Sequence, residues 1–301
     1  MKIAVIGGSG FIGSHLVDKL MDDGHDVTVY DIMKPHRDVK HIFIDLMDFH
    51  RTVVALAGDY DVYYVLAAMA NVNDIYKNPL ETAIVNFQGV VNILEAVRRY
   101  GGRIVLASTV WVYMLAKEEH VNEDTPLVMQ NVNHTYTASK IAAELYVQSY
   151  NKLYGTEFTI LRYGIPYGPR GRGGTVITNF VSKAFKKEPL TITGDGSQFR
   201  NFIYVEDLAE GNVAALKEPA KNKVYNLEGI RPVTIKEVAE TVSKIFGGVK
   251  IEYIEQRVGD FKGKIASNEK SYKELGWKPK VDLEEGIRKY IEWYKTEVIH
   301  K

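Results

Sequence analysis

Short apolar runs alternate with helix-length amphipathic stretches through the first half of the chain, and this alternation constrains the fold more than any other feature. The apolar runs are near-continuous, as expected of strands that are covered on both faces. Strands joined through helices with right-handed crossovers form a parallel sheet. We therefore predict an α/β fold, a doubly wound parallel sheet, with strands at KIAVI (2–6), DVTVY (26–30), HIFI (41–44), DVYYVL (61–66), GRIVLAS (102–108) and EFTIL (157–161). The helices predicted between them cover Phe11–Asp23, Asp48–Leu56, Leu80–Arg99 and Thr135–Tyr154.

The character of the sequence changes after Arg162. Residues 162–174, RYGIPYGPRGRGG, hold five glycines and two prolines, which indicates a loop over a site. A helix is expected at Val176–Lys186, and a helical tail from Ile235 onward. We predict a first domain over residues 1–163, to which residues 201–226 return, and a smaller C-terminal α/β region formed by residues 164–200 and 227–301.

Charge and composition exclude several classes of protein. Lys+Arg and Asp+Glu both total 38 in 301 residues, so a neutral chain without a long basic run is a poor candidate for nucleic-acid binding. The chain has no cysteine, which excludes disulfides, thiolate metal sites and cysteine nucleophiles. The apolar run at the N-terminus is broken by glycines, and no later run approaches 18 apolar residues. We expect a soluble, cytoplasmic protein without a membrane partner.

The stretch GGSGFIG places Gly7, Gly10 and Gly13 directly after the first strand and at the start of the first helix. Glycines there permit a tight turn and close approach of a pyrophosphate, and the helix N-terminus supplies N–H groups. Asp31 ends the second strand, where a carboxylate accepts a hydrogen bond from a ribose 2′-hydroxyl and repels a 2′-phosphate. The pattern predicts NAD rather than NADP as cofactor; the alternative is a tight turn followed by a helix-capping aspartate.

The pattern Tyr-x-x-x-Lys can place a phenol beside an ammonium, and the chain contains it three times. One pair straddles the end of the second strand, and another follows the fifth strand without helical periodicity. Only the third lies in the first turns of a strong helix, where residues i and i+4 share a face. The three pairs are Tyr30–Lys34, Tyr113–Lys117 and Tyr136–Lys140, and the last is predicted to carry chemistry. A lysine ammonium and the positive nicotinamide of NAD⁺ are both expected to lower the phenol pKa from its usual value near 10, which would make Tyr136 a general base.

Motifs over nearly the whole chain resemble the extended short-chain dehydrogenase/reductase family of NAD-dependent nucleotide-sugar epimerases and dehydratases, closest in pattern to UDP-glucose 4-epimerase. They are GGSGFIG, LAA (66–68), NFQGVVNILEA, ST (108–109), YTASK, LRYGIPYGPR, GDGSQFRNFIYVEDLAEG and RVGD…ELGWKP. The resemblance implies a Rossmann domain that binds NAD and a C-terminal region that binds a nucleotide sugar, without a metal. It implies cofactor contacts from Gly7, Gly10, Phe11, Ile12, Gly13, Asp31, Ile32, Asp45, Leu46, Leu66, Ala67, Ala68, Asn86, Ser108, Tyr136, Lys140, Tyr163 and Pro166.

By the same resemblance, Thr109, Tyr136 and Lys140 are the catalytic residues. Thr109 matches the family's hydroxyl that hydrogen-bonds the reacting oxygen, although a threonine at a strand end is often only a backbone cap. Substrate contacts are implied for Thr109, Tyr136, Arg200, Arg257 and Asp260, the two arginines on the diphosphate and Asp260 on the nucleoside ribose. The alternative for the arginines is a pair of surface ion pairs.

Val110 and Trp111 stand where family members that eliminate water carry acids, as in T-D-E-V-Y-G, and where UDP-glucuronate decarboxylases place a glutamate. A valine cannot donate a proton to a leaving hydroxide, and family reductases that make GDP-fucose need a cysteine. Transient oxidation and re-reduction at C4 need only NAD and the three catalytic residues. The prediction is a UDP-glucose/UDP-galactose type 4-epimerase with non-stereospecific hydride return; the alternatives are a dehydratase, decarboxylase or oxidoreductase of the same family, or a non-catalytic NAD-binding regulator.

Two further features bear on the substrate and on assembly. Ile165 replaces an asparagine that binds substrate phosphate in many relatives, and Lys264 falls near the sugar's 2-substituent, where a solvated lysine is favoured over a substrate contact. Relatives pair as homodimers through helices that match residues 80–99 and 135–154. Apolar residues on these helices are compatible with a homodimer here, and they include Ala83, Val90, Ile141 and Leu145.

Overall fold

The structure, a computed structural model, describes residues 1–255 and 263–299, without the side chains of residues 72 and 73. Its centre is a seven-stranded parallel sheet with the order β12-β7-β5-β4-β1-β2-β3. The strands are β1 (Lys2–Ile6), β2 (Asp26–Asp31), β3 (Lys40–Phe43), β4 (Val62–Val65), β5 (Arg103–Thr109), β7 (Glu157–Tyr163) and β12 (Lys223–Leu227). The predicted doubly wound α/β fold is confirmed.

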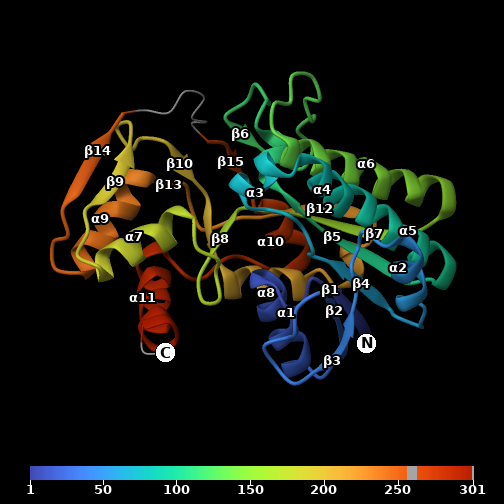
Figure 1. Cartoon of the computed structure of the whole chain (residues 1–301). Helices are drawn as coiled ribbons and strands as arrows, with labels where there is room; N and C mark the ends of the chain where they lie inside the picture. The colour runs from blue at the N-terminus through green and yellow to red at the C-terminus, as the bar shows by residue number, and fades with distance from the viewer. Residues whose placement is uncertain (256–262, 300–301) are drawn as a thin grey trace.

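Helices cover both faces of this sheet, as Figure 1 shows. On one face lie α1 (Phe11–Asp22) and α8 (Val205–Ala214); on the other lie α2 (Phe49–Ala55), α5 (Gly89–Tyr100) and α6 (Thr135–Tyr154). Successive side chains of a strand point to opposite faces, so Ile3 and Val5 pack toward α1 and α8, and Ala4 and Ile6 pack toward α5 and α6. This double burial is why the strands read as continuous apolar runs.

The six strands and the helix at Thr135–Tyr154 agree with the sequence prediction to within about two residues. The single helix expected over Leu80–Arg99 is wrong in detail, because it consists of α4 (Pro79–Ala83), a π-helical turn (Ile84–Gln88) and α5. The helical tail expected from Ile235 is also interrupted. It contains β14 (Ile251–Ile254), whose alternating sequence IEYI suits a strand that pairs with β9 (Leu190–Thr193).

The smaller C-terminal half has its own apolar core, formed by α7 (Val176–Phe185), α9 (Ile235–Ile245) and α11 (Leu283–Tyr294) around the β9–β14 pair. Two short strand pairs lie between the halves: β8 (Ile165–Tyr167) with β11 (Phe202–Tyr204), and β6 (His120–Val121) with β15 (Ile265–Ala266). After β11 the chain returns to the large sheet through α8 and β12. The domain boundary near residue 163 stays a prediction.

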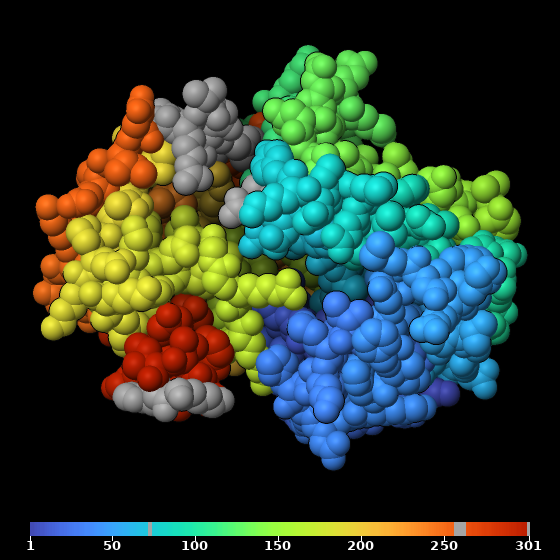
Figure 2. All heavy atoms as spheres, viewed as in Figure 1, coloured from blue at the N-terminus to red at the C-terminus, as the bar shows by residue number. Residues whose placement is uncertain are grey.

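The carboxyl ends of the sheet strands meet at one edge, which is where open α/β sheets bind ligands. Thr109 lies opposite Tyr163, and Tyr163 lies opposite Leu227, so the last residues of three strands line up there. Figure 2 shows a furrow between the yellow segments of the C-terminal half and the cyan segments around α3 (Val72–Lys77) and α4. Across the described part of the chain, every helix is too short or too polar to cross a membrane.

Candidate active site

The loop between β1 and α1 is a cradle that admits only glycine at two positions. Gly7 has φ +88°, and a Cβ there would lie 2.4 Å from Ala67 N. A Cβ on Gly13 would lie 2.1 Å from Gly7 O, so the helix packs directly on the turn. Gly10 precedes α1 and contributes no side-chain cap, which leaves the N–H groups of the first turn for an anion.

Asp31 lies beside this cradle, at the end of β2. Its carboxylate accepts hydrogen bonds from Ser9 N at 2.9 Å and from Met33 N at 3.0 Å, and it is only 8% exposed. These two bonds hold the carboxylate next to the glycine turn while leaving acceptor capacity for a ligand hydroxyl. Ile32, which follows it, is 62% exposed and offers an apolar surface. A cradle for a pyrophosphate, a fixed carboxylate and an apolar surface together fit a dinucleotide with a free ribose 2′-hydroxyl.

Other predicted cofactor residues surround the same strand edge. Leu66 N and Ala67 N both donate to Ile6 O, at 2.8 and 3.0 Å, and so hold the end of β4 against the glycine turn. Asp45 is exposed, and its Oδ1 accepts from Met47 N at 3.0 Å. The remaining predicted positions are half-buried or buried around this edge: Phe11, Ile12, Leu46, Ala68 and Pro166.

Asn86, one of the predicted cofactor contacts, forms hydrogen bonds with two other segments of the site. It lies in the π-helical turn and is fully buried; its Oδ1 accepts from Met69 N at 2.7 Å, and its Nδ2 donates to Met69 O at 2.9 Å. Its Nδ2 also reaches Ser139 Oγ at 3.3 Å. Asn86 therefore joins the loop after β4 to helix α6, and its described hydrogen bonds position other residues of the site.

The glycine-rich segment after β7 extends from the C-terminal half over the start of α1. A Cβ on Gly171 would lie 3.5 Å from the Phe11 ring, and one on Gly174 would lie 3.8 Å from Asn71 Nδ2. A hydrogen bond of 2.9 Å between His15 Nε2 and Pro169 O anchors the segment. In Figure 2 this yellow-green segment reaches across toward the blue N-terminal residues.

Thr109, Tyr136 and Lys140 meet at the carboxyl edge of the sheet. Thr109 ends β5, and its side chain forms a hydrogen bond with that of Tyr136 in the first turn of α6. Lys140 lies one turn later; its Nζ donates to Ala107 O at 2.9 Å and lies 5.8 Å from the centroid of the Tyr136 ring. Helix α6 and strand β5 together therefore place a phenol, a hydroxyl and an ammonium in one small volume.

Burial controls the pKa values of this group. It raises the pKa of Tyr136 to about 12, and the hydrogen bond with Thr109 opposes it only in part. Burial also lowers the pKa of Lys140 to about 8, against the pull of the Glu144 carboxylate. In the protein alone the Tyr136 pKa is raised above its usual value near 10 rather than lowered as expected, because burial removes water from the phenol. A second positive charge at the site is needed to favour the phenolate.

In the other two Tyr-x-x-x-Lys pairs the tyrosine is part of the core and the lysine is exposed. The Tyr30 hydroxyl donates to Ala55 O at 3.0 Å and lies 2.9 Å from the Tyr60 hydroxyl. The Tyr113 hydroxyl donates to Asn226 Oδ1 at 3.0 Å and accepts from Arg162 Nη1 at 2.6 Å. Both phenols are buried in hydrogen-bond networks, which agrees with the choice of Tyr136 from its position on a helix.

A buried charge network beneath the site was not predicted from the sequence. Arg162 and Glu144 form a bidentate pair with distances of 3.0 and 2.6 Å, and Ser108 Oγ donates to Glu144 Oε1 at 2.5 Å. The Ser108 hydroxyl thus faces Glu144. The Tyr163 hydroxyl similarly donates to Asn212 Oδ1 at 2.5 Å. The sequence offered one indication of this network: Glu144 lies one helical turn after Lys140, on a helix whose inner face is covered.

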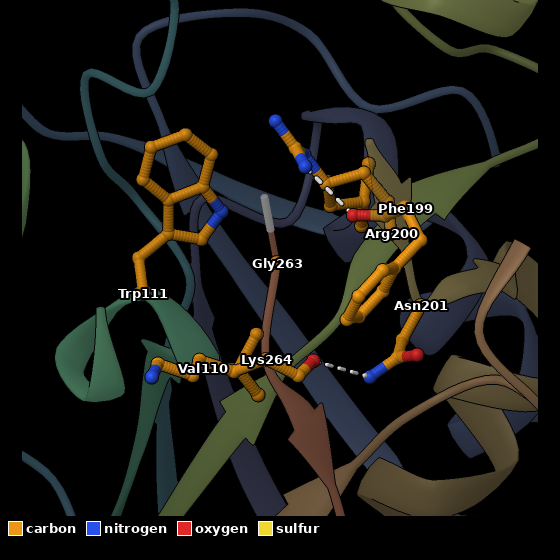
Figure 3. Close-up of a pocket in the computed structure, with 8 residues that line it drawn as sticks. Val110, Trp111, Phe199, Arg200, Asn201, Gly263 and Lys264 are labelled. Carbon is orange, nitrogen blue, oxygen red and sulfur yellow. Dashed lines mark hydrogen bonds between the residues drawn. The ribbon is translucent and has the colours of Figure 1, made fainter. Parts of the chain in front are cut away.

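A small cavity of about 20 Å³ lies beyond Thr109, and Figure 3 shows its walls. Trp111 and Arg200 stand on opposite sides of it, and Val110 and Lys264 lie together at its base. Ile165, Phe199, Asn201 and Gly263 complete the lining. Arg200 Nη1 donates to Phe199 O at 2.7 Å. The predicted substrate residues Arg257 and Asp260 lie outside the described residues.

Lys264 is half-buried, and its ammonium group forms two hydrogen bonds with the backbone. Its Nζ donates to Ala116 O at 2.6 Å and to Glu118 O at 2.8 Å, so the ammonium fastens the segment after β5 to the C-terminal half. The half-buried ammonium is therefore bound to the protein backbone as well as reached by solvent. Sequence reasoning could not detect this role, because the two carbonyl groups lie about 150 residues away in the chain.

Comparison with known proteins agrees with this geometry. Residues 3–227 match the model of the NAD dependent epimerase/dehydratase family. The chain belongs to this family. Among curated relatives, the "Putative UDP-glucose 4-epimerase" of Methanocaldococcus jannaschii is 36% identical over 98% of both chains. The UDP-glucuronic acid decarboxylase 1 of Xenopus tropicalis is 34% identical over all of this chain and 73% of its own length.

Solved structures of family members share the whole fold. The UDP-glucose 4-epimerase of Thermotoga maritima, determined with UDP-glucose, has a TM-score of 0.91 at 29% identity and covers 98% of this chain and 99% of its own. The UDP-glucose 4-epimerase of Thermus thermophilus, determined with NAD, has a TM-score of 0.88 at 31% identity over 99% of this chain and 100% of its own. As a member of this epimerase/dehydratase family, the protein is an NAD-dependent enzyme of nucleotide-sugar chemistry.

Proposed function

We propose that the protein is a UDP-sugar 4-epimerase in which Thr109, Tyr136 and Lys140 act on the sugar 4-hydroxyl. When bound, NAD would supply a reversible two-electron oxidant and a positive charge that favours the Tyr136 phenolate. The phenolate takes the hydroxyl proton, and Thr109, already within hydrogen-bonding distance of Tyr136, holds the reacting oxygen. The 4-keto sugar turns in the site, and Tyr136 returns the proton after reduction from the other face.

The residues after Thr109 support epimerisation over the other reactions of the family. Dehydration and decarboxylation both need a proton donor near the sugar ring, and family members supply a carboxyl group at these positions. Here Val110 and Trp111 line the cavity, and none of its eight described lining residues is an acid. Oxidation followed by re-reduction at one carbon needs only the tyrosine, lysine and threonine. The absence of an acid from this described lining therefore supports epimerisation.

The experiment is proton NMR of the purified protein with added NAD⁺ and UDP-glucose, UDP-N-acetylglucosamine or UDP-glucuronate in parallel. The proposal expects the galacto isomer to appear from at least one sugar and to approach an equilibrium mixture. Tyr136→Phe is the matched control, since it removes one hydroxyl and should abolish turnover. A regulator that binds NAD without catalysis would show no turnover in either protein.

A second candidate is decarboxylation of UDP-glucuronate, because several curated relatives at 33–34% identity are UDP-glucuronic acid decarboxylases. The UDP-glucuronate sample separates the two reactions directly. Release of CO₂ with a pentose product would support the decarboxylase, and a galacturonate product would support the epimerase.

We also propose that the protein forms a homodimer through α5 and α6. The outer surface of α6 exposes large apolar side chains, including Leu145 at 42%, Tyr146 at 44% and Leu153 at 71%. Such exposed side chains are typical of protein interfaces. Val90 and Ile141 are at most 5% exposed and belong to the monomer core, so the proposed interface would use other side chains of these helices. Sedimentation equilibrium of the wild type and of Leu153→Glu tests the dimer, which the substitution should weaken.

A further inference from the structure

Glu228 is a buried acid at the carboxyl edge of the sheet, directly after β12. The residue is 1% exposed, and both of its carboxyl oxygens lack a hydrogen-bond partner among the described residues. Burial raises the pKa of Glu228 well above its usual range. An ionised carboxylate in such a place is costly unless it is paired, so the group is stable there only as the neutral acid.

Backbone from two other segments fixes the position of this carboxyl group. A Cβ on Gly164 would lie 2.3 Å from Glu228 Oε2 and 2.6 Å from Asn201 O, so the group fits only because residue 164 is glycine. Asn268 holds the main chain of Glu228: its Oδ1 accepts from Glu228 N at 2.8 Å, and its Nδ2 donates to Glu228 O at 2.9 Å. The acid is thus held in one place rather than left to choose among rotamers.

Asn201 presents the complementary acceptor. Its Nδ2 donates to Lys264 O at 3.2 Å, and its Oδ1 is buried without a hydrogen-bond partner in the described structure. Glu228 and Asn201 both lie against Gly164, and the Asn201 amide opposes the burial that raises the pKa of Glu228 only in part. A neutral carboxylic acid has one O–H donor, which is what an amide oxygen needs. We propose that Glu228 is a positioning residue whose carboxyl O–H donates to Asn201 Oδ1 and fixes the Asn201 wall of the substrate cavity.

The hydrogen bond from Glu228 would complete a chain of donors across the cavity. Asn201 lines the cavity and donates to Lys264 O, as the dashed line in Figure 3 shows. Lys264 in turn donates through Nζ to Ala116 O and Glu118 O, on the segment that follows Trp111. Glu228 would thereby fix the relative positions of three segments around the cavity, those that contain Asn201, Lys264 and residues 116–118. That the walls of this cavity contact the nucleotide sugar rests on the proposed function.

Charged side chains on the neighbouring elements have described interactions of their own. Arg162, from β7, pairs with Glu144; Arg200, from β10, donates to Phe199 O; and Lys264 donates to two carbonyl groups. Other charged residues nearby also have partners: Glu123 accepts from Asn226 N, Arg231 pairs with Glu237, Glu269 pairs with Lys273, and Lys270 lies over the Tyr225 ring. Since these charges face other partners, the neutral form of Glu228 is the one that the surroundings favour.

The first test is urea unfolding of the wild type and Glu228→Gln between pH 5 and pH 8, with Glu188→Gln, an exposed glutamate of the same half, as control. Glutamine keeps an N–H donor for Asn201 Oδ1 but does not titrate. The native state retains the Glu228 proton while the unfolded chain loses it above about pH 4.3, so rising pH favours unfolding of the wild type. The unfolding constant of the wild type relative to Glu228→Gln should rise about tenfold per pH unit until the native pKa is reached. A ratio that stays constant with pH, as expected for Glu188→Gln, would overturn the neutral-acid assignment.

The second test asks whether the hydrogen bond positions the cavity. Glu228→Leu keeps a similar volume but removes the donor, and it should raise the KM of the nucleotide sugar at least tenfold with less than threefold change in kcat. Glu228→Gln should restore the KM to within about threefold of the wild type, since its side chain keeps a donor. Equal KM values for the leucine and glutamine variants would refute the positioning role. If no sugar is turned over, the proposed function fails while the unfolding comparison still decides the state of Glu228.

Discussion

Removing the buried carboxylate of Glu144 should destabilise the protein more than removing its partner Arg162. The two side chains are 0% and 4% exposed and form a bidentate pair. Breaking a buried ion pair from one side typically costs about 3–5 kcal/mol, because the remaining charge stays buried. The two single substitutions differ in what they leave behind.

Glu144→Gln leaves two buried cations, because both Arg162 and Lys140 face the lost carboxylate. Arg162→Met leaves Glu144 with Lys140 as its remaining cation, one helical turn away. We expect Glu144→Gln to lower the free energy of unfolding by about 4–5 kcal/mol and Arg162→Met by about 3 kcal/mol. The double variant should lose less stability than the two single variants added together. Each substitution removes the charge that would be left buried without a partner by the other.

Equilibrium unfolding in urea at pH 7 measures these differences. The control is Glu95→Gln, which breaks the half-exposed pair with Arg98 on α5 and should change the unfolding free energy only slightly. If Arg162→Met proved the more damaging of the two, or if the losses simply added, the assignment of Lys140, Glu144 and Arg162 to one charge network would be wrong.

Three further predictions concern the site. Gly13→Ala should lose NAD binding by more than about 100-fold, since its Cβ would meet Gly7 O at 2.1 Å; titration calorimetry with NAD⁺ measures this, and binding within threefold of the wild type would contradict the cradle. The kcat/KM should rise between pH 6 and pH 8, because burial raises the pKa of Tyr136 and leaves little phenolate at low pH even where bound NAD opposes this; a falling kcat/KM over that range would argue against a phenolate base. Lys264→Met should raise the substrate KM several-fold by releasing Ala116 O and Glu118 O, and an unchanged KM would assign those two hydrogen bonds to stability alone.

Local patterns predicted the parts of the structure that local forces decide. The six apolar strands, the glycine turn and the choice of Tyr136 all depend on periodicity or on spacing within one segment. Strand β12 did not appear among the predicted strands, because KVYNL is short and mixed and joins the sheet only after a long excursion through the C-terminal half. The sequence also shows which charges are near Tyr136, but not how completely the fold removes water from them.

The functions of Glu228 and Lys264 could not be read from the chain for the same reason. A glutamate or a lysine between polar neighbours is usually solvated, and that expectation holds until a distant segment covers it. Glu228 is buried because Gly164 and Asn201 close over it, and Lys264 is held by carbonyl groups of residues 116 and 118. Sequence patterns identify the reacting groups, whereas the residues that position them depend on tertiary contacts.

The central claim is that the sugar is oxidised and re-reduced at the same carbon, with Tyr136 moving the proton. The most direct measurement is proton NMR of the reaction with a UDP-sugar carrying deuterium at C4, in ordinary water with bound NAD. The account predicts a galacto product that keeps the deuterium at C4 and no build-up of reduced cofactor, with the reaction absent in Tyr136→Phe. Loss of the deuterium to solvent, or release of CO₂ with a pentose product, would contradict it.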